Sequence, residues 1–120
     1  MKQTVYILGE RYRIRFRDYS ADPLFAERGI DGYHDSIDKL IVVGNMNTFP
    51  SWQNESAEYC RKAEKQILRH EIIHAFLTQS GLEDSAVHFD GAWSKNEEMV
   101  DFFALQIPKI VRVFEELEIL

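Results

Sequence analysis

The chain has 120 residues, of which 45% are hydrophobic and 28% charged, and its formal net charge is −6. This length supports a hydrophobic core of its own, so we expect one domain over residues 1–120. The acidic balance, 14 Lys and Arg against 20 Asp and Glu, argues against a protein whose main partner is nucleic acid or an anionic membrane surface.

Several features of the chain favour a cytoplasmic location. No stretch approaches 18 consecutive apolar residues, and Met1–Thr4 leads into a strand pattern instead of a signal peptide. The lone Cys60 cannot form an internal disulfide, which fits a reducing compartment. We interpret Cys60 as a small helix residue, not as a nucleophile or ligand.

Residues 5–17 predict two strands that are joined by a turn at Gly9. In the second strand, Tyr12, Ile14 and Phe16 alternate with arginines, so the aromatic and aliphatic side chains should face the core. The opposite face carries Arg11, Arg13, Arg15 and Arg17. Such a row could bind nucleic acid, but alternation with core residues is typical of a half-solvated strand, which we favour.

The next segments complete a sheet of three or four strands. Residues 20–30 contain Asp22-Pro23 and Gly29 and predict a loop with one helical turn around residues 24–27. Residues 31–44 predict a second hairpin, whose last strand is the β-branched run of residues 40–43. We therefore expect an α+β fold with a small, twisted, mostly antiparallel sheet.

The second half of the chain has the pattern of helices. A long helix should begin between Ser51 and Ser56, run through residue 77 and stop at Gly81. After a polar, irregular stretch, Ser94 is expected to cap a second helix over residues 95–107. Pro108 should end or kink that helix, and an amphipathic segment follows over residues 109–120.

The first of these helices contains the motif H-E-x-x-H at residues 70–74. Positions i and i+4 lie on one face of a helix, so His70 and His74 can aim their ring nitrogens at one point. That point suits zinc, which takes histidine nitrogen and, in catalytic sites, three protein ligands and one water. Glu71 then lies beside the metal and becomes the candidate general base.

The neighbours of this motif are apolar on almost every side: Ile67, Leu68, Ile72, Ile73, Ala75, Phe76 and Leu77. Such a helix is usually buried. Burying two imidazoles and a carboxylate costs several kcal/mol unless they are paired or bind a metal. A metal site therefore explains a pattern that a packed core alone does not.

Two histidines do not complete a zinc site. The metzincin extension is excluded, because it needs glycine where Leu77 stands and histidine where Ser80 stands. Downstream, Glu97 and Asp101 share one face of the second predicted helix, which would present a glutamate beside the first helix. Glu97 could instead form a capping box with Ser94. His88 is the main rival ligand, and His34 is interpreted as an ordinary loop histidine.

Three segments resemble the ImmA/IrrE type of zinc metallopeptidase, a minimal gluzincin-like family associated with phages and mobile elements. They are the sheet from Gly32-Tyr33 to residues 40–43, the H-E-x-x-H helix, and residues 97–108, which are similar to the family's E-x-x-A-N/D-x-F-A segment with its closing proline. The resemblance implies a zincin-like fold, with the small sheet packed on the zinc-binding helix and the C-terminal helix carrying the third ligand.

The same resemblance implies that His70, His74 and Glu97 bind zinc, that Glu71 is the base and that Asp101 orients a ligand histidine. We therefore expect a peptidase that hydrolyses a peptide bond of a protein or peptide substrate through metal-activated water. Tyr33 or His88 could stabilise the oxyanion, and an exposed sheet edge could hold the substrate. The alternative is a zinc-binding interaction module of a phage or mobile element that cleaves nothing.

Overall fold

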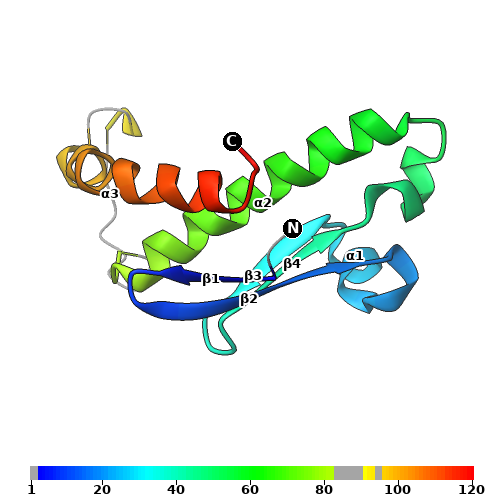
Figure 1. The fold of residues 1–120 in the computed structure, drawn as a ribbon, viewed down its shortest axis with the longest axis horizontal. Helices are drawn as coiled ribbons and strands as arrows, with labels where there is room; N and C mark the ends of the chain where they lie inside the picture. The colour runs from blue at the N-terminus through cyan, green and yellow to red at the C-terminus, as the bar shows by residue number, and fades with distance from the viewer. Residues whose placement is uncertain (1–2, 83–90, 94–95) are drawn as a thin grey trace.

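The computed structural model, which describes residues 3–82, 91–93 and 96–120, is an α+β fold in which two helices cover one face of a four-stranded sheet (Figure 1). The strands are β1 Thr4–Ile7, β2 Glu10–Arg17, β3 Gly32–Asp35 and β4 Leu40–Gly44. The helices are α1 Pro23–Arg28, α2 Ala57–Gln79 and α3 Glu97–Glu116. No described helix has the length and apolar character that crossing a membrane requires.

The sheet has the order β1-β2-β4-β3 and is mixed. Both predicted hairpins are confirmed, because β1 pairs antiparallel with β2, and β3 with β4. The central pair, β2 with β4, is parallel, which the sequence pattern did not indicate. The chain between them crosses through α1 and the edge strand β3, so this parallel pairing depends on contacts between distant segments.

The first hairpin follows from its turn and its alternation. Leu8 and Gly9 both have positive φ, 49° and 89°, as a two-residue turn of the kind that matches strand twist requires. Tyr12 and Ile14 are fully buried and Phe16 packs against the same core, as predicted. The four arginines of β2 are exposed or half-exposed on the other face.

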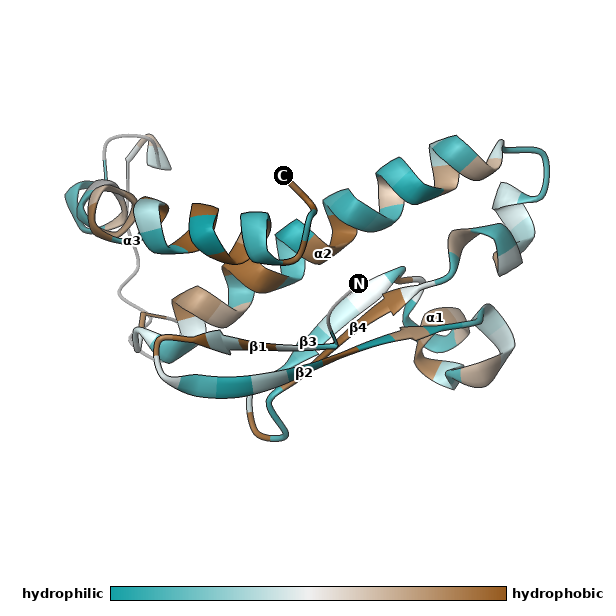
Figure 2. Ribbon diagram, in the orientation of Figure 1, coloured by the Kyte–Doolittle hydropathy of each residue, from teal (hydrophilic) through white to brown (hydrophobic). Residues whose placement is uncertain are grey.

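Helix α2 begins and ends near the predicted residues. The Ser56 hydroxyl accepts a hydrogen bond of 3.1 Å from the Tyr59 N–H, and Gly81 follows the helix with a φ of 82°. The first half of α2 is hydrophilic and reaches beyond the sheet, whereas its second half carries the hydrophobic side chains (Figure 2). The H-E-x-x-H motif therefore lies in the half that packs on β3 and β4.

Helix α3 differs from its prediction at both ends. Its N-cap is Asn96, whose side-chain oxygen accepts from the Met99 N–H, and not Ser94, which lies outside the described residues. The helix continues through Pro108 to Glu116, although its first turns are seen nearly end-on and its later turns side-on in Figure 1. The helix therefore does not end at Pro108 but bends along its length, and Phe102 before this proline and Phe114 after it pack on one core.

Two apolar clusters fill the space around the sheet. The main core lies between the sheet, α2 and α3 and includes Val5, Ile14, Ile41, Leu68, Ile72, Phe76, Phe102, Phe114 and Ile119. A smaller cluster joins Phe25 of α1 to Val42, Met46, Phe49 and Cys60. Cys60 is a buried, free thiol on α2, which confirms its interpretation as a packing residue.

Candidate metal centre

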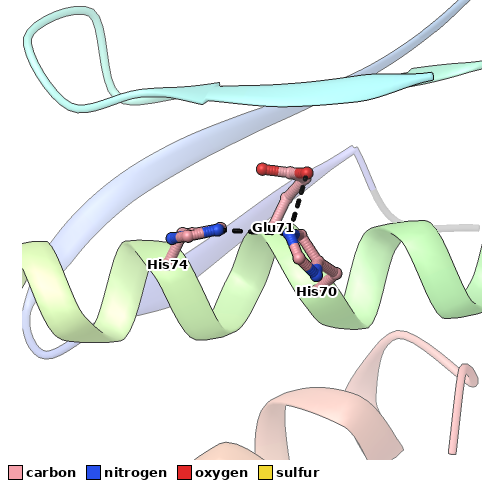
Figure 3. Close-up of side chains that lie close together, drawn as sticks. All are labelled: His70, Glu71 and His74. Carbon is pink, nitrogen blue, oxygen red and sulfur yellow. Dashed lines mark hydrogen bonds and ion pairs between the residues drawn. The ribbon is translucent and has the colours of Figure 1, made fainter. Parts of the chain in front are cut away.

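The structure brings His70, Glu71 and His74 together on α2 (Figure 3). One ligand atom from each of these side chains lies within 4.8 Å of the other two. Glu71 extends from the helix toward the sheet, and the rings of the two histidines turn toward each other. The sequence motif therefore produces the cluster of nitrogen and oxygen atoms that it predicts.

The spacing of the two imidazoles fits a single bound ion. Their Nε2 atoms lie 3.1 Å apart. Two nitrogens that bind one tetrahedral zinc ion at about 2.05 Å lie about 3.3 Å from each other. The rings meet edge to face, at an angle of 70°, so each nitrogen can point at a common position instead of stacking on its neighbour.

Glu71 is one of two buried charged residues in the described part of the chain, with 7% of its surface exposed. Its Oε2 lies 3.9 Å from His70 Nε2. Burial raises the pKa of Glu71, the positive charges of protonated His70 and His74 would lower that pKa, and Asp31 raises it again. A carboxyl group whose pKa is raised by burial next to two imidazole rings is suited to accept and return a proton.

Gly32 explains how the sheet comes so close to Glu71. A Cβ on Gly32 would lie 2.5 Å from Ile67 Cγ2 and 3.0 Å from the Val42 carbonyl oxygen, and 3.8 Å from Glu71 Cγ. A side chain would therefore push β3 away from α2. Because glycine stands here, the strand covers Glu71 and shields it from water.

His34 also belongs to this region, although its sequence context predicted a loop. It lies in β3, and its half-buried ring is nearly parallel to that of His74, with an interplanar angle of 5° and centroids 6.3 Å apart. The alternation of side chains along residues 32–35 could have shown that Gly32 and His34 lie on the same side of this strand. Once β3 pairs with β4 with His34 opposite Ile41, His34 must face α2, because opposite residues share a face.

A cleft of about 830 Å³ opens beside the histidines and the carboxylate. His70 and Glu71 line it, and α2 continues its wall through Ala63, Gln66 and Ile67. The other lining residues come from the segments around α1 and from the loop before α2: Tyr19, Phe25, Ala26, Gly29, Ile30, Asp31, Gly32, Met46, Phe49, Pro50, Ser51 and Trp52. No lysine or arginine is among the described residues that line this cleft.

The other predicted site residues are placed differently. Glu97 is exposed in the first turn of α3, and Asp101 is exposed one turn later. Among the described residues, neither belongs to the compact group of ligand atoms. With Asn96 as the N-cap, Glu97 is the first helical residue, whereas the alternative of a capping box with Ser94 needs it to be the third, so the helix start contradicts that alternative. His88 lies outside the described residues.

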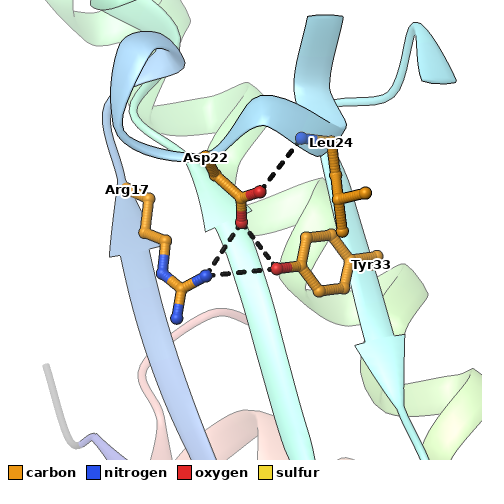
Figure 4. A network of polar contacts seen from close by, with 4 residues as sticks. All are labelled: Arg17, Asp22, Leu24 and Tyr33. Atoms are coloured by element: carbon orange, nitrogen blue, oxygen red, sulfur yellow. Dashed lines mark hydrogen bonds and ion pairs between the residues drawn. The ribbon is translucent and has the colours of Figure 1, made fainter. Parts of the chain in front are cut away.

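Tyr33 lies on the face of the sheet opposite α2, so it cannot stabilise an oxyanion at this centre. Its hydroxyl donates a hydrogen bond of 2.5 Å to Asp22 Oδ2, and Arg17 Nη1 lies 2.8 Å from the same oxygen (Figure 4). Asp22 also accepts from the Leu24 N–H and thereby caps α1. Tyr33 thus joins β3 to β2 and α1.

Comparison with known proteins adds no family to this geometry, since no family model, no curated protein and no solved structure matches the chain significantly.

Proposed function

We propose that the chain is a zinc-dependent peptidase with a zincin-like fold, similar to the ImmA/IrrE type, in which His70 and His74 hold the metal. The observation that carries this proposal is the 3.1 Å separation of the two Nε2 atoms beside a buried carboxylate. A site that only held a structural ion would have no use for Glu71, because that side chain is placed next to the imidazoles at the energetic cost of burying a charge.

The chemistry divides between the ion and Glu71. A zinc ion held by the two histidines would supply a Lewis acid that polarises the peptide carbonyl and acidifies a water molecule. Glu71 takes a proton from a water molecule as the oxygen of that water bonds to the carbonyl carbon. Glu71 then returns the proton to the amine as the carbon–nitrogen bond breaks. Burial by β3 keeps Glu71 away from bulk water during this transfer.

We propose Glu97 as the third ligand and Asp101 as the carboxylate that orients a ligand histidine. The motif resemblance supports both roles, and the helix that carries these residues packs against α2. Because Glu97 is exposed in the first turn of α3, binding the ion would require its side chain to turn toward α2. A site with two histidines alone would bind zinc weakly.

The substrate that fits this arrangement is an extended peptide with a large apolar side chain near the bond that is cut. In the described residues β3 is an edge strand. The Asp31 carbonyl accepts from the Gly44 N–H, so Asp31 bonds toward β4, and by alternation the backbone groups of Gly32 and His34 face the open edge. A peptide added to this edge would lie along the cleft, whose aromatic walls suit an apolar side chain.

A zinc-binding interaction module is the second candidate. It is favoured by one observation: the compact ligand group in the described residues contains His70, Glu71 and His74, with no further ligand from another element. The two functions differ in the role of Glu71, since only a peptidase needs its proton transfer.

The test begins with elemental analysis of protein purified without chelators, which should give one zinc per chain. The metal should be lost as pH falls below about 6, because imidazole must be neutral to bind it. A library of fluorogenic peptides then tests hydrolysis, with chelator-treated protein as the control. Absence of any stoichiometric transition metal contradicts the proposal, and zinc without hydrolysis supports the interaction module.

A further inference from the structure

Beyond the residues that would touch the ion, we propose that His34 is a positioning residue that fixes the ring of His74. This inference rests on the proposed metal site for its functional consequence, but the positioning itself is a property of the metal-free protein. It assigns a role to a side chain that takes no part in the proposed hydrolysis.

The first support is the geometry of three aromatic rings. The rings of His34 and His74 are nearly parallel, at 5°. The ring of His34 also stacks on that of Tyr12, at an angle of 27° and with centroids 6.2 Å apart. His34 therefore forms the middle of a column that runs from β2 through β3 to α2. Rotation of the His74 ring about its Cβ–Cγ bond would break the parallel contact.

The second support is that the far end of this column is fixed. Tyr12 is fully buried, and its hydroxyl donates a hydrogen bond of 2.8 Å to Gln79 Oε1. The Lys39 ammonium donates to the same oxygen at 2.9 Å and lies 6.0 Å from the centre of the Tyr12 ring. Because Gln79 is near the end of α2, the column connects two points of one helix through the sheet.

The consequence concerns the difference between the two ligand histidines. The side chain of His70 is 65% exposed, and no described ring besides that of His74 contacts it. His74 is half-buried against His34. His74 is therefore held ready for the ion by the sheet, whereas His70 can adjust when the ion binds. Contacts that orient a ligand typically change metal affinity by about 10- to 100-fold.

The experiment compares His34→Ala, which removes the ring, with His34→Phe, which keeps a flat ring without nitrogen atoms. Tyr33→Phe is the matched control, because residue 33 is the neighbour of His34 but faces the other side of β3. In metal-free protein, the imidazole Cε1–H and Cδ2–H resonances of His74 are assigned by NMR. We expect these resonances to shift toward random-coil values in His34→Ala and to stay near their wild-type positions in His34→Phe and Tyr33→Phe.

Titration with Co²⁺, monitored by the visible absorption of the bound ion, then measures the metal affinity of each variant. His34→Ala should bind about 10- to 100-fold more weakly than wild type, and His34→Phe should recover most of this loss. Unchanged His74 resonances in His34→Ala overturn the inference, as does a His34→Phe variant that binds as weakly as His34→Ala. If the resonances shift as expected but wild-type protein binds no metal, the positioning stands and the proposed function fails.

Discussion

The two buried carboxylates of the described residues, Asp22 and Glu71, lie on opposite faces of the same sheet and have opposite surroundings. Asp22, 4% exposed, accepts hydrogen bonds from Tyr33, Leu24 and Arg17. Burial acts to raise the pKa of Asp22, but these bonds outweigh it and lower that pKa. Within the described part of the chain, Glu71 has no comparable set of donors, and burial raises its pKa.

This difference indicates that Asp22 stabilises the fold, whereas Glu71 is free to bind a cation or a proton. Three donors stabilise the negative charge of Asp22, so it joins β2, β3 and α1 and has no reason to exchange protons near neutral pH. Glu71 is destabilised as a bare charge and faces a cleft, so it gains from a nearby cation or a proton. Substitutions in each region test whether the two roles are separate.

The largest expected effect comes from Glu71→Gln. This change removes the proposed base and keeps the side-chain shape, so hydrolysis of a substrate found in the peptide screen should fall by about 10² or more. Zinc content and melting temperature should stay close to wild type. Undiminished turnover in this variant would show that Glu71 is not the base.

Zinc titrations of three variants, each of which replaces one acidic residue of α3 by alanine, test the rest of the proposed site. Glu97→Ala should abolish tight binding, and Asp101→Ala should weaken it by about 10- to 100-fold. Glu98→Ala is the control and should have little effect, because Glu98 is turned about 100° away from Glu97 around the helix. Loss of zinc in Glu98→Ala with retention in Glu97→Ala would mean that Glu97 has been misassigned.

Asp22→Ala should change stability and leave the metal centre intact. The change removes the shared acceptor of the half-buried Tyr33 and Arg17 side chains and the N-cap of α1, so we expect a loss of about 2–3 kcal/mol in the free energy of unfolding. Denaturant titration measures this loss. Zinc affinity should remain within about threefold of wild type, because the two carboxylates lie on opposite faces and share no partner. A loss of zinc affinity in Asp22→Ala would show that the Asp22 network and the metal centre depend on each other.

Gly32→Ala tests the close contact that buries Glu71. The new Cβ meets Ile67 Cγ2 at 2.5 Å, so the variant should lose about 1–3 kcal/mol of stability. In an Ile67→Ala background the same change should cost less, and the double-mutant cycle measured by denaturant gives the coupling. If Gly32→Ala costs the same stability in both backgrounds, the contact with Ile67 is not the cause of that cost.

The pH dependence of stability should show the Asp22 network at both ends of the scale. The folded pKa of Asp22 is lowered, so its contribution is complete above the unfolded value of about 4 and is lost as pH falls through the folded pKa. Burial and the hydrogen bond to Asp22 raise the pKa of Tyr33 to about 12. Its contribution is therefore complete below about 10 and is lost between about 10 and 12.

Melting temperatures of wild type and Asp22→Asn, measured across both ranges, check this expectation. The difference between the two proteins should be largest between about pH 5 and 9 and should shrink below pH 4 and above pH 10. A difference that is independent of pH would mean that Asp22 acts through its shape and not its charge.

The parts of the fold that depend on local patterns could be predicted from the sequence. Alternation identified the buried side of β2, and cap residues located the ends of α2 near Ser56 and Gly81. The motif spacing brought His70 and His74 together because one helical turn decides it. The parallel pairing of β2 with β4 could not be predicted in this way, since it joins distant segments that carry no signal of register.

The lack of information on contacts between distant segments also explains the wrong predictions for residues at the site. Tyr33 and His34 are adjacent, so knowing which of them faces α2 requires the register of β3 against β4. Asn96 displaced Ser94 as the N-cap because several cap-competent residues lie together, and propensity alone does not choose among them. Whether Glu97 reaches the ion depends on how α3 sits against α2, which the pattern within α3 does not determine.

The close approach of Gly32 to Glu71 also has a consequence for the order of events during folding. His70 and His74 come together as soon as one helical turn forms, because they lie four residues apart in α2. Glu71 is shielded only after β3 has docked on α2, and this contact joins segments that lie far apart in the chain, so it should form later. We therefore expect the two imidazoles to be paired during folding before the carboxylate beside them is shielded from water.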